Sequence, residues 1–502
     1  MTKHGIIIAL LVLAGPARAD KPGAIHGRVV YDGTAPARSP LKVDVNIDVC
    51  AKHGPVLGED LLVGKDRGLA NVVLFLAGIT ERAPVARDAK LDQRGCVFLP
   101  HVQSVTAGST LVIGNDDPVV HNVHARVDGE TVFNLGMPLR GVHIKRRMKA
   151  PGVTVLSCDS GHKWMLAYVV VVPHGYHSTS SAEGEFTITD IQPGTYTLRA
   201  WHERLGIMDV PVTVRAGLDT EVTLSFGSKS ARDVPLTFAT AAEPRVTVTA
   251  TMAPAIATEG DQEVALTARR AQRDVDHAAG RMSYLRHCAS CHGDAGDGHG
   301  EAARWQSSRP RDFTRGEIEL RSTRSGEPAR EEDLVRTISL GVPGTDMPAW
   351  AGELAPSERR LLARYVMSLS DRYYQAPPSA PVVIPQETTR DAASVARGKE
   401  IWNKLKCNQC HGDDGGSPGA SHRLVDDWGE DVDAADLRRS VYKSGPLPAD
   451  LYRTLVTGLS GTPMPAFSDL ISPSETWDLV HFIQTLAREP GLFDWLFSNE
   501  KE

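Results

Sequence analysis

Two short cysteine motifs carry the strongest chemical signal in the sequence. Each has the form C-x-x-C-H, once from Cys288 to His292 and once from Cys407 to His411. Two thiols about one helical turn apart can each add to a vinyl group of haem, and the adjacent histidine then lies under the iron. A single motif of this kind could also be a redox dithiol or half of a zinc site, although haem attachment is favoured even then. The spacing therefore predicts covalent haem attachment, with those two alternatives still open.

A methionine follows each motif within the same short frame. The two segments are Gly-Thr-Asp-Met-Pro-Ala-Trp (344–350) and Gly-Thr-Pro-Met-Pro-Ala-Phe (461–467), at nearly equal distances from the cysteines. A thioether is a soft ligand for iron, and ligation by histidine and methionine raises the potential of a haem. Either methionine alone could fill a gap in a hydrophobic core, but the repeated frame favours ligation. The chain is thus predicted to hold two haem-binding units in tandem.

Helices must position these ligands. Residues 282–287 and 400–406 have a helical apolar pattern, and Pro-Ser-Glu at 356–358 and 473–475 predicts further helices with serine as the N-cap. Tyr365 and Phe482 of these later helices are expected to pack against the earlier ones. The order of helix, attachment site, loop, methionine and helix resembles a class I cytochrome c, twice over, at residues 276–372 and 394–490.

This resemblance implies two covalently bound haem c groups and a one-electron carrier. The cysteines that would form the thioether bonds are Cys288, Cys291, Cys407 and Cys410. The axial ligands would be His292 and Met347 for the first haem, and His411 and Met464 for the second. Four prolines in residues 373–393 predict an extended, semi-rigid linker between the two units.

The N-terminus predicts export. Residues 1–19 have a positive charge at Lys3, an apolar run over 6–13 and a small-x-small site at 17–19, as in a secretory signal peptide. The run is shorter than the roughly 20 residues that span a bilayer, and no later stretch is long and apolar enough to do so. We therefore expect an exported, soluble protein of a bacterial periplasm, without a transmembrane span after cleavage of the signal.

Composition excludes some classes of function. The 502 residues are 41% hydrophobic and 23% charged, which fits several globular domains. With 55 basic against 62 acidic residues, the chain is not a nucleic-acid binder that depends on a basic surface.

Short β-branched runs separated by Gly, Pro and Asp turns predict an all-β N-terminal half. Examples of the expected strands are the runs at 27–31, 70–76, 109–113, 153–157, 168–172, 186–189, 196–201 and 221–226. Two segments among them could bind a metal. One contains His121 in Asn-Asp-Asp-Pro-Val-Val-His-Asn-Val-His (115–124), and the other has the spacing C-x3-H-x2-M at Cys158, His162 and Met165.

Thiolate, two imidazoles and a weak thioether are the ligands of a mononuclear blue-copper site. The arrangement resembles cupredoxins, and the resemblance implies a Greek-key domain at 24–175 with copper ligands His121, Cys158, His162 and Met165. Thr154 stands where a dinuclear site would need a second cysteine, which disfavours that site. Zinc accepts the same donors, and a metal-free sandwich is the remaining alternative. His124 should face the other side of its strand.

The number of cysteines fits this interpretation. Four of the seven are assigned to haem, and an exported protein favours a disulfide between Cys50 and Cys96. Cys158 then remains as a single thiol, for which a metal provides an explanation.

Two further segments, 176–227 and 228–275, separate the cupredoxin-like region from the haem-binding units. Residues 176–227 resemble the carboxypeptidase regulatory-like β-sandwich, and 228–275 are expected to be a linker. Trp201-His202-Glu203 could cap a metal site, although a buried tryptophan with surface neighbours is the favoured interpretation.

Three functions fit these motifs. The first is one-electron transfer between periplasmic redox partners, with two haems and one copper. The second is an enzyme, either a dihaem peroxidase or a haem–copper reductase, which would need an open coordination position. In the third, a metal-free β domain docks the cytochromes to a dehydrogenase or oxidase. The sequence favours the carrier over the catalyst.

Overall fold

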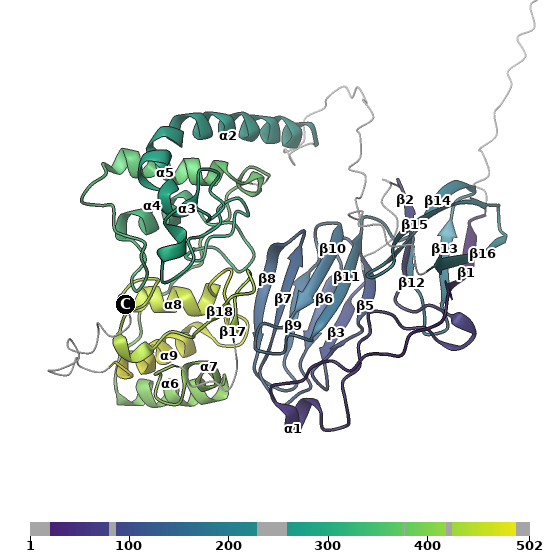
Figure 1. The fold of residues 1–502 in the computed structure, drawn as a ribbon, viewed down its shortest axis with the longest axis horizontal. Coiled ribbons are helices and arrows are strands. Elements are labelled where there is room, and N and C mark those ends of the chain that lie inside the picture. The colour runs from purple at the N-terminus through teal and green to yellow at the C-terminus, as the bar shows by residue number, and fades with distance from the viewer. Residues whose placement is uncertain (1–20, 80–86, 228–258, 376, 418–423, 488–502) are drawn as a thin grey trace, which may run out of the picture.

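The computed structural model describes residues 21–79, 87–227, 259–375, 377–417 and 424–487, so the expected signal segment 1–19 lies outside the described residues. The N-terminal half is built of sheets and the C-terminal half of helices (Figure 1). This confirms the predicted multidomain class, all-β followed by all-α. In the described part of the chain, no helix is both long and apolar enough to cross a membrane.

The larger β unit is a sandwich of two sheets. Its five-stranded sheet has the order β5-β11-β10-β7-β8, and its four-stranded sheet the order β4-β3-β6-β9. Alternating apolar residues of both sheets, such as Leu111, Val123 and Leu156, form one buried core. The strands are β3 (Ala89–Gln93), β4 (Phe98–Leu99), β5 (Val102–Thr106), β6 (Thr110–Gly114), β7 (His121–Val127), β8 (Glu130–Met137), β9 (His143–Arg147), β10 (Gly152–Ser157) and β11 (Leu166–Val172).

The smaller β unit draws on both ends of the β half. Its sheets have the orders β13-β1-β16 and β12-β2-β14-β15, around a core that includes Ile25, Leu74 and Leu198. The strands are β1 (Gly23–Asp32), β2 (Val73–Ala77), β12 (His177–Thr179), β13 (Glu185–Ile191), β14 (Gly194–His202), β15 (Gly206–Val214) and β16 (Asp219–Gly227). The sequence assigned β1 and β2 to the larger unit, but they pair with strands after residue 176 and complete the smaller one.

The chain passes from β1 to β2 through short helices. These are α1 (Ile47–Cys50) and the 3-10 helix η1 (Lys65–Arg67). Helix α1 lies at the foot of the larger sandwich in Figure 1, and Cys50 belongs to the core of that sandwich. The segment between β1 and β2 therefore contributes side chains to the cores of both β units.

The first helical unit contains α2 (Glu259–His287), α3 (Ala289–His292), α4 (Glu331–Leu340) and α5 (Pro356–Ser368), with 3-10 helices η2 (Ala303–Trp305) and η3 (Asp371–Tyr373). Helix α2 begins inside the segment 228–275 that the sequence assigned to a linker. Residues 228–258 lie outside the described part.

The second helical unit contains α6 (Ala392–Lys404), α7 (Asn408–His411), η4 (Leu437–Arg439), α8 (Pro448–Thr457), α9 (Pro473–Thr485) and two short strands, β17 (Leu424–Val425) and β18 (Asp431–Val432).

The two helical units repeat one packing arrangement. Tyr365 of α5 contacts α2, where its ring centroid is 4.6 Å from that of Tyr284, and Phe482 of α9 lies 5.7 Å from Trp402 of α6. This confirms the expected aromatic packing. The expected serine N-caps are wrong: α5 and α9 each begin with proline at the first helical turn, and Ser472 caps α9 through its hydroxyl.

The segment between the helical units, residues 377–391, has no helix or strand and is attached to both units. The amide of Val382 donates to the carbonyl of Ser322 in the first unit at 2.7 Å. Glu387 pairs with His481 of the second unit at 3.2 Å. The proline-rich linker thus lies against both units.

Strand β8 at the edge of the five-stranded sheet is where the β half meets the helical half (Figure 1). The amide of Asn134 donates to the hydroxyl of Ser325 in the first helical unit at 3.0 Å. The carbonyl of Asn134 accepts from the amide of Ala466 in the second unit at 3.3 Å. Both helical units are therefore hydrogen-bonded to the same residue of β8.

Candidate functional site

The sheet order brings the candidate metal ligands together. Strand β10 pairs with both β7 and β11, so the loop that follows β10 lies over the beginning of β7. Cys158 is the first residue of this loop, His162 lies further along it, and His121 is the first residue of β7. Three side chains from two distant segments therefore meet at one end of the sheet.

The distances between these donors fit a single metal ion. The Nδ1 atoms of His121 and His162 are 3.2 Å apart, and Cys158 Sγ lies 3.8 Å and 3.7 Å from them. Ligands at bond lengths of about 2.0 Å for nitrogen and 2.3 Å for sulfur lie roughly 3.3–3.8 Å apart around one ion. All three side chains are buried, with 0%, 3% and 0% exposure for His121, Cys158 and His162.

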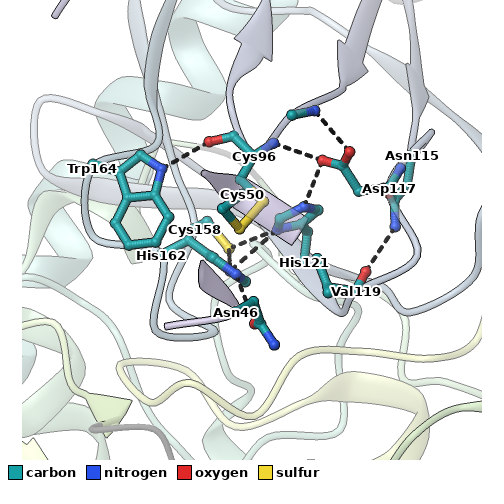
Figure 2. Close-up of a disulfide and its surroundings, with 11 residues drawn as sticks. Asn46, Cys50, Cys96, Asn115, Asp117, Val119, His121, Cys158, His162 and Trp164 are labelled. Carbon is teal, nitrogen blue, oxygen red and sulfur yellow. Dashed lines mark hydrogen bonds and ion pairs between the residues drawn. A yellow bond between two sulfur atoms is a disulfide. The ribbon is translucent and has the colours of Figure 1, made fainter. Parts of the chain in front are cut away.

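Two polar side chains hold the far nitrogens of the histidine rings (Figure 2). His121 Nε2 lies 3.0 Å from Asp117 Oδ2, and His162 Nε2 lies 3.0 Å from Asn46 Oδ1. Such partners fix the orientation of a metal-binding imidazole and direct its other nitrogen to the ion. Both Nδ1 atoms thus face the sulfur of Cys158. These roles of Asp117 and Asn46 were missed in the sequence, although Asp117 lies only four residues before His121.

Burial controls the protonation of the site. It raises the pKa of the Cys158 thiol to about 12, although amide N–H groups near the sulfur act in the opposite direction. Burial also lowers the pKa of His121, in spite of Asp117. Burial would raise the pKa of Asp117, but hydrogen bonds from His121 and from the amides of Cys96 and Gly95 lower it. Burial thus favours the uncharged forms of the Cys158 thiol and of the His121 ring.

Met165 and the disulfide complete the surroundings. Met165 is buried in the same core as Cys158, and its amide donates to the carbonyl of His162 at 2.9 Å; its role as an axial ligand stays a prediction. Cys50 and Cys96 form a disulfide whose sulfurs belong to a close group with the His162 ring (Figure 2). The disulfide and the metal ligands thus share one buried region.

Other residues that the sequence offered as metal ligands lie outside the trio of His121, Cys158 and His162. His124 contacts Asp159 at 2.7 Å and Thr131 at 2.7 Å, on the other face of β7 from His121, as the strand period requires. Trp201 packs edge to face on Tyr168 at 5.5 Å, and Glu203 hydrogen-bonds to His101. The segment 201–203 therefore joins the two β units and contributes nothing to the trio.

The two C-x-x-C-H motifs have the same local structure. Each histidine ends a short helix, α3 or α7, and donates from Nδ1 to a backbone carbonyl: His292 to Arg311 at 3.0 Å and His411 to Ala435 at 3.1 Å. This hydrogen bond occupies Nδ1 of each ring and leaves Nε2, on the side away from that carbonyl, to bind iron. The four motif cysteines are not in disulfides, so their thiols fit attachment to haem.

The methionine loops repeat as well. The amide of Met347 donates to Thr345 Oγ1 at 3.2 Å, and the amide of Met464 donates to Thr462 Oγ1 at 3.2 Å. The carbonyl of each methionine accepts a hydrogen bond from the amide of the second residue after the preceding helix, Val342 at 3.1 Å and Leu459 at 3.0 Å. The shared frame of the sequence therefore gives one loop conformation twice.

Comparison with known proteins decides the nature of the helical half. Residues 275–366 and 393–483 each match the family described as cytochrome c oxidase, cbb3-type, subunit III. The helical half consists of two cytochrome c domains. Two domains of this kind imply covalently bound haem c. Residues 152–222 match a different family, polysaccharide lyase family 4, domain II.

Individual relatives cover parts of the chain. The cbb3-type cytochrome c oxidase subunit CcoP of Helicobacter pylori (strain 52) is 27% identical over 145 residues, 27% of this chain and 37% of that protein. The chain thus spans little more than a third of this relative. A chain of the reducing HAO-like protein complex of Kuenenia stuttgartiensis is 35% identical, with 42% of this chain and 96% of that chain covered and a TM-score of 0.40. A purple cupredoxin of Nitrosopumilus maritimus is 25% identical, with coverages of 17% and 100% and a TM-score of 0.15.

Proposed function

We propose that the chain is an exported electron carrier in which one copper ion and two haem c groups exchange single electrons with periplasmic redox partners. His121, Cys158 and His162 hold the copper, with Met165 as the weak axial ligand. His292 with Met347, and His411 with Met464, ligate the two haem irons. When bound, the copper supplies a one-electron couple.

The observation that carries this proposal is the geometry of the trio. Three soft or borderline donors face one point in a buried region, and hydrogen bonds to Asp117 and Asn46 fix both rings. Two imidazoles and one thiolate with an adjacent methionine suit copper, whereas a structural zinc site takes four strong ligands in a tetrahedron. A rigid, buried ligand set also suits a carrier, because it limits rearrangement when the charge of the ion changes.

Ligation of both haems by histidine and methionine favours a carrier over an enzyme. A catalytic haem needs an open position for its substrate, and in this proposal neither iron has one. The cbb3-type oxidase subunits among the relatives make a terminal oxidase one candidate for the external partner.

Spectroscopy of single variants tests the copper assignment. Addition of cupric ion should give the wild-type protein an intense visible thiolate-to-copper band and a cupric EPR signal. Cys158→Ser should lose the band, whereas His124→Gln, changed on the other face of β7, should keep it. Uptake of zinc alone, or a band that survives in Cys158→Ser, would contradict the proposal.

A further inference from the structure

Strand β8 gives the candidate copper site a direct connection to one of the two cytochrome c domains. The connection begins at the sulfur of Cys158, which accepts the backbone amide of Asn122 at 3.5 Å. The side chain of Asn122 donates from Nδ2 to Oδ1 of Asn134 on β8 at 2.8 Å. Asn122 Oδ1 also accepts the amides of Asp159 and Ser160, at 2.6 Å and 3.0 Å, so its amide group is held from both ends. Asn122 and Asn134 are both buried.

The connection continues into the loop of the second haem ligand. The carbonyl of Asn134 accepts the amide of Ala466, two residues after Met464. The amide of Gly136 donates back to the carbonyl of Ala466 at 3.4 Å. A Cβ atom at Gly136 would lie 2.9 Å from the Phe467 ring and 3.2 Å from Pro465. Glycine at this position therefore lets the methionine loop lie directly on β8.

A second contact joins the same two sites. The ammonium group of Lys406, the residue before Cys407, donates to the carbonyl of Pro118. Pro118 follows Asp117, which holds the His121 ring. Both the attachment motif and the methionine loop of the second domain thus reach segments that form the copper site.

The first cytochrome c domain contacts β8 through other residues. Its hydrogen bonds to Thr131 and Asn134 come from Glu317, Ser325 and Arg372, all outside its attachment motif and its methionine loop. Its methionine loop instead faces the second domain, because a Cβ atom at Gly344 would lie 3.3 Å from Val441.

The ligands of the first haem are also linked to the Met464 loop. The carbonyl of Arg311 accepts the Nδ1 proton of His292, and the Arg311 guanidinium lies 4.6 Å from the centroid of the Trp428 ring. That ring contacts Gly461 of the Met464 loop, where a Cβ atom would lie 3.4 Å from Trp428. The Met464 loop therefore lies between the copper site and the first haem ligands.

We infer that the centres form a series in which the second haem, held by the C-terminal domain, exchanges electrons directly with the copper site, and the first haem is reached only through it. Electron tunnelling is faster through covalent and hydrogen bonds than across gaps, and Asn122 and Asn134 supply those bonds. The spatial order thus differs from the order of the ligands along the chain.

This inference rests on the proposed function, because it needs copper at Cys158. The step itself is simple. With copper held by His121, Cys158 and His162, one electron would pass from the cuprous ion to the ferric haem held by His411 and Met464. This would leave cupric copper and ferrous haem, with no bond broken and no proton moved. The same step runs in reverse when the haem is the more reducing centre.

A matched pair of variants tests the connection. Asn134→Leu removes the side-chain link to Asn122 and leaves the backbone bond to Ala466, whereas Ser325→Ala removes the contact of the first domain to the same residue. After a pulse of a one-electron reductant, the fast redistribution between copper and haem should be lost in Asn134→Leu and kept in Ser325→Ala. If Asn134→Leu keeps it, or Ser325→Ala loses it, the inference is overturned.

An equilibrium measurement of the haem potentials provides a second test. The potentials of both haems are measured in copper-loaded and copper-free protein, and each is assigned by Met347→His or Met464→His, which lowers one potential at a time. Copper should shift the potential of the second haem and leave the potential of the first haem unchanged. If copper shifts the potential of the first haem, or shifts neither potential, the proposed order of the centres is overturned. A protein that binds no copper refutes the proposed function itself, whereas copper that shifts the first haem refutes only the order.

Discussion

His121 Nε2 lies 3.0 Å from Asp117 Oδ2, and this contact turns the other ring nitrogen toward the sulfur of Cys158. Partners of this kind are typically worth 10–100-fold in metal affinity. Asp117→Ala should therefore weaken copper binding by roughly 10–100-fold. Competition with a chelator measures the change. Asp116→Ala, one residue away and paired instead with Arg94, is the matched control, and equal affinities of the two variants would contradict this role for Asp117.

Both haem irons are expected to be closed to added ligands. With methionine bound on one side and histidine on the other, the reduced wild-type protein should show no spectral shift under carbon monoxide. Met464→Ala should open one iron, so that about half of the haem responds. Difference spectra of the reduced proteins measure this. A full response of the wild-type protein would support the dihaem enzyme instead.

The contact between His101 and Glu203 makes the stability of the β half depend on pH. Burial lowers the pKa of His101, but the hydrogen bond and charge of Glu203 outweigh it, so the pKa is raised above the ordinary value of 6.5. The stabilisation is therefore complete below pH 6.5 and is lost as pH rises through the raised pKa of the folded state. Thermal unfolding at acid and alkaline pH should show this loss in wild type. Glu203→Gln should remove that component of the pH dependence, and an unchanged profile would contradict the assignment.

Arg126 of β7 forms an ion pair with Asp427 of the second cytochrome c domain. The Asp427 side chain is only 4% exposed, against 21% for Arg126, so the pair is partly desolvated. Loss of one partner from such a pair should cost roughly 2 kcal/mol of docking free energy, less than for a fully buried pair. Asp427→Ala should separate the unfolding of the β half from that of the helical half in calorimetry. Asp433→Ala, at an exposed position nearby, should leave a single transition.

Local sequence signals predicted the parts of this molecule that depend on short spacing. The C-x-x-C-H motifs, the methionine frames and the eight strands need only neighbouring residues to be recognised. The distribution of strands between the two β units was wrong, because β1 pairs with β13 and β16, and no local pattern records a partner so far along the chain.

The residues that support the proposed copper site were missed for a related reason. Asn46 reaches His162 from another segment, and Asn134 matters only because β8 lies against the Met464 loop. Their types are common in loops and strands, so the sequence alone gives no signal for them. Contacts across the fold, and not residue type, give them a role.

The most direct test of copper binding at Cys158 is the ratio of copper to iron in protein matured in a periplasm and desalted over a chelator. We expect one copper for two irons in the wild-type protein, and two irons without copper in Cys158→Ser. Two irons without copper in the wild-type protein would contradict copper binding at Cys158 and leave a dihaem cytochrome whose β half serves only for docking.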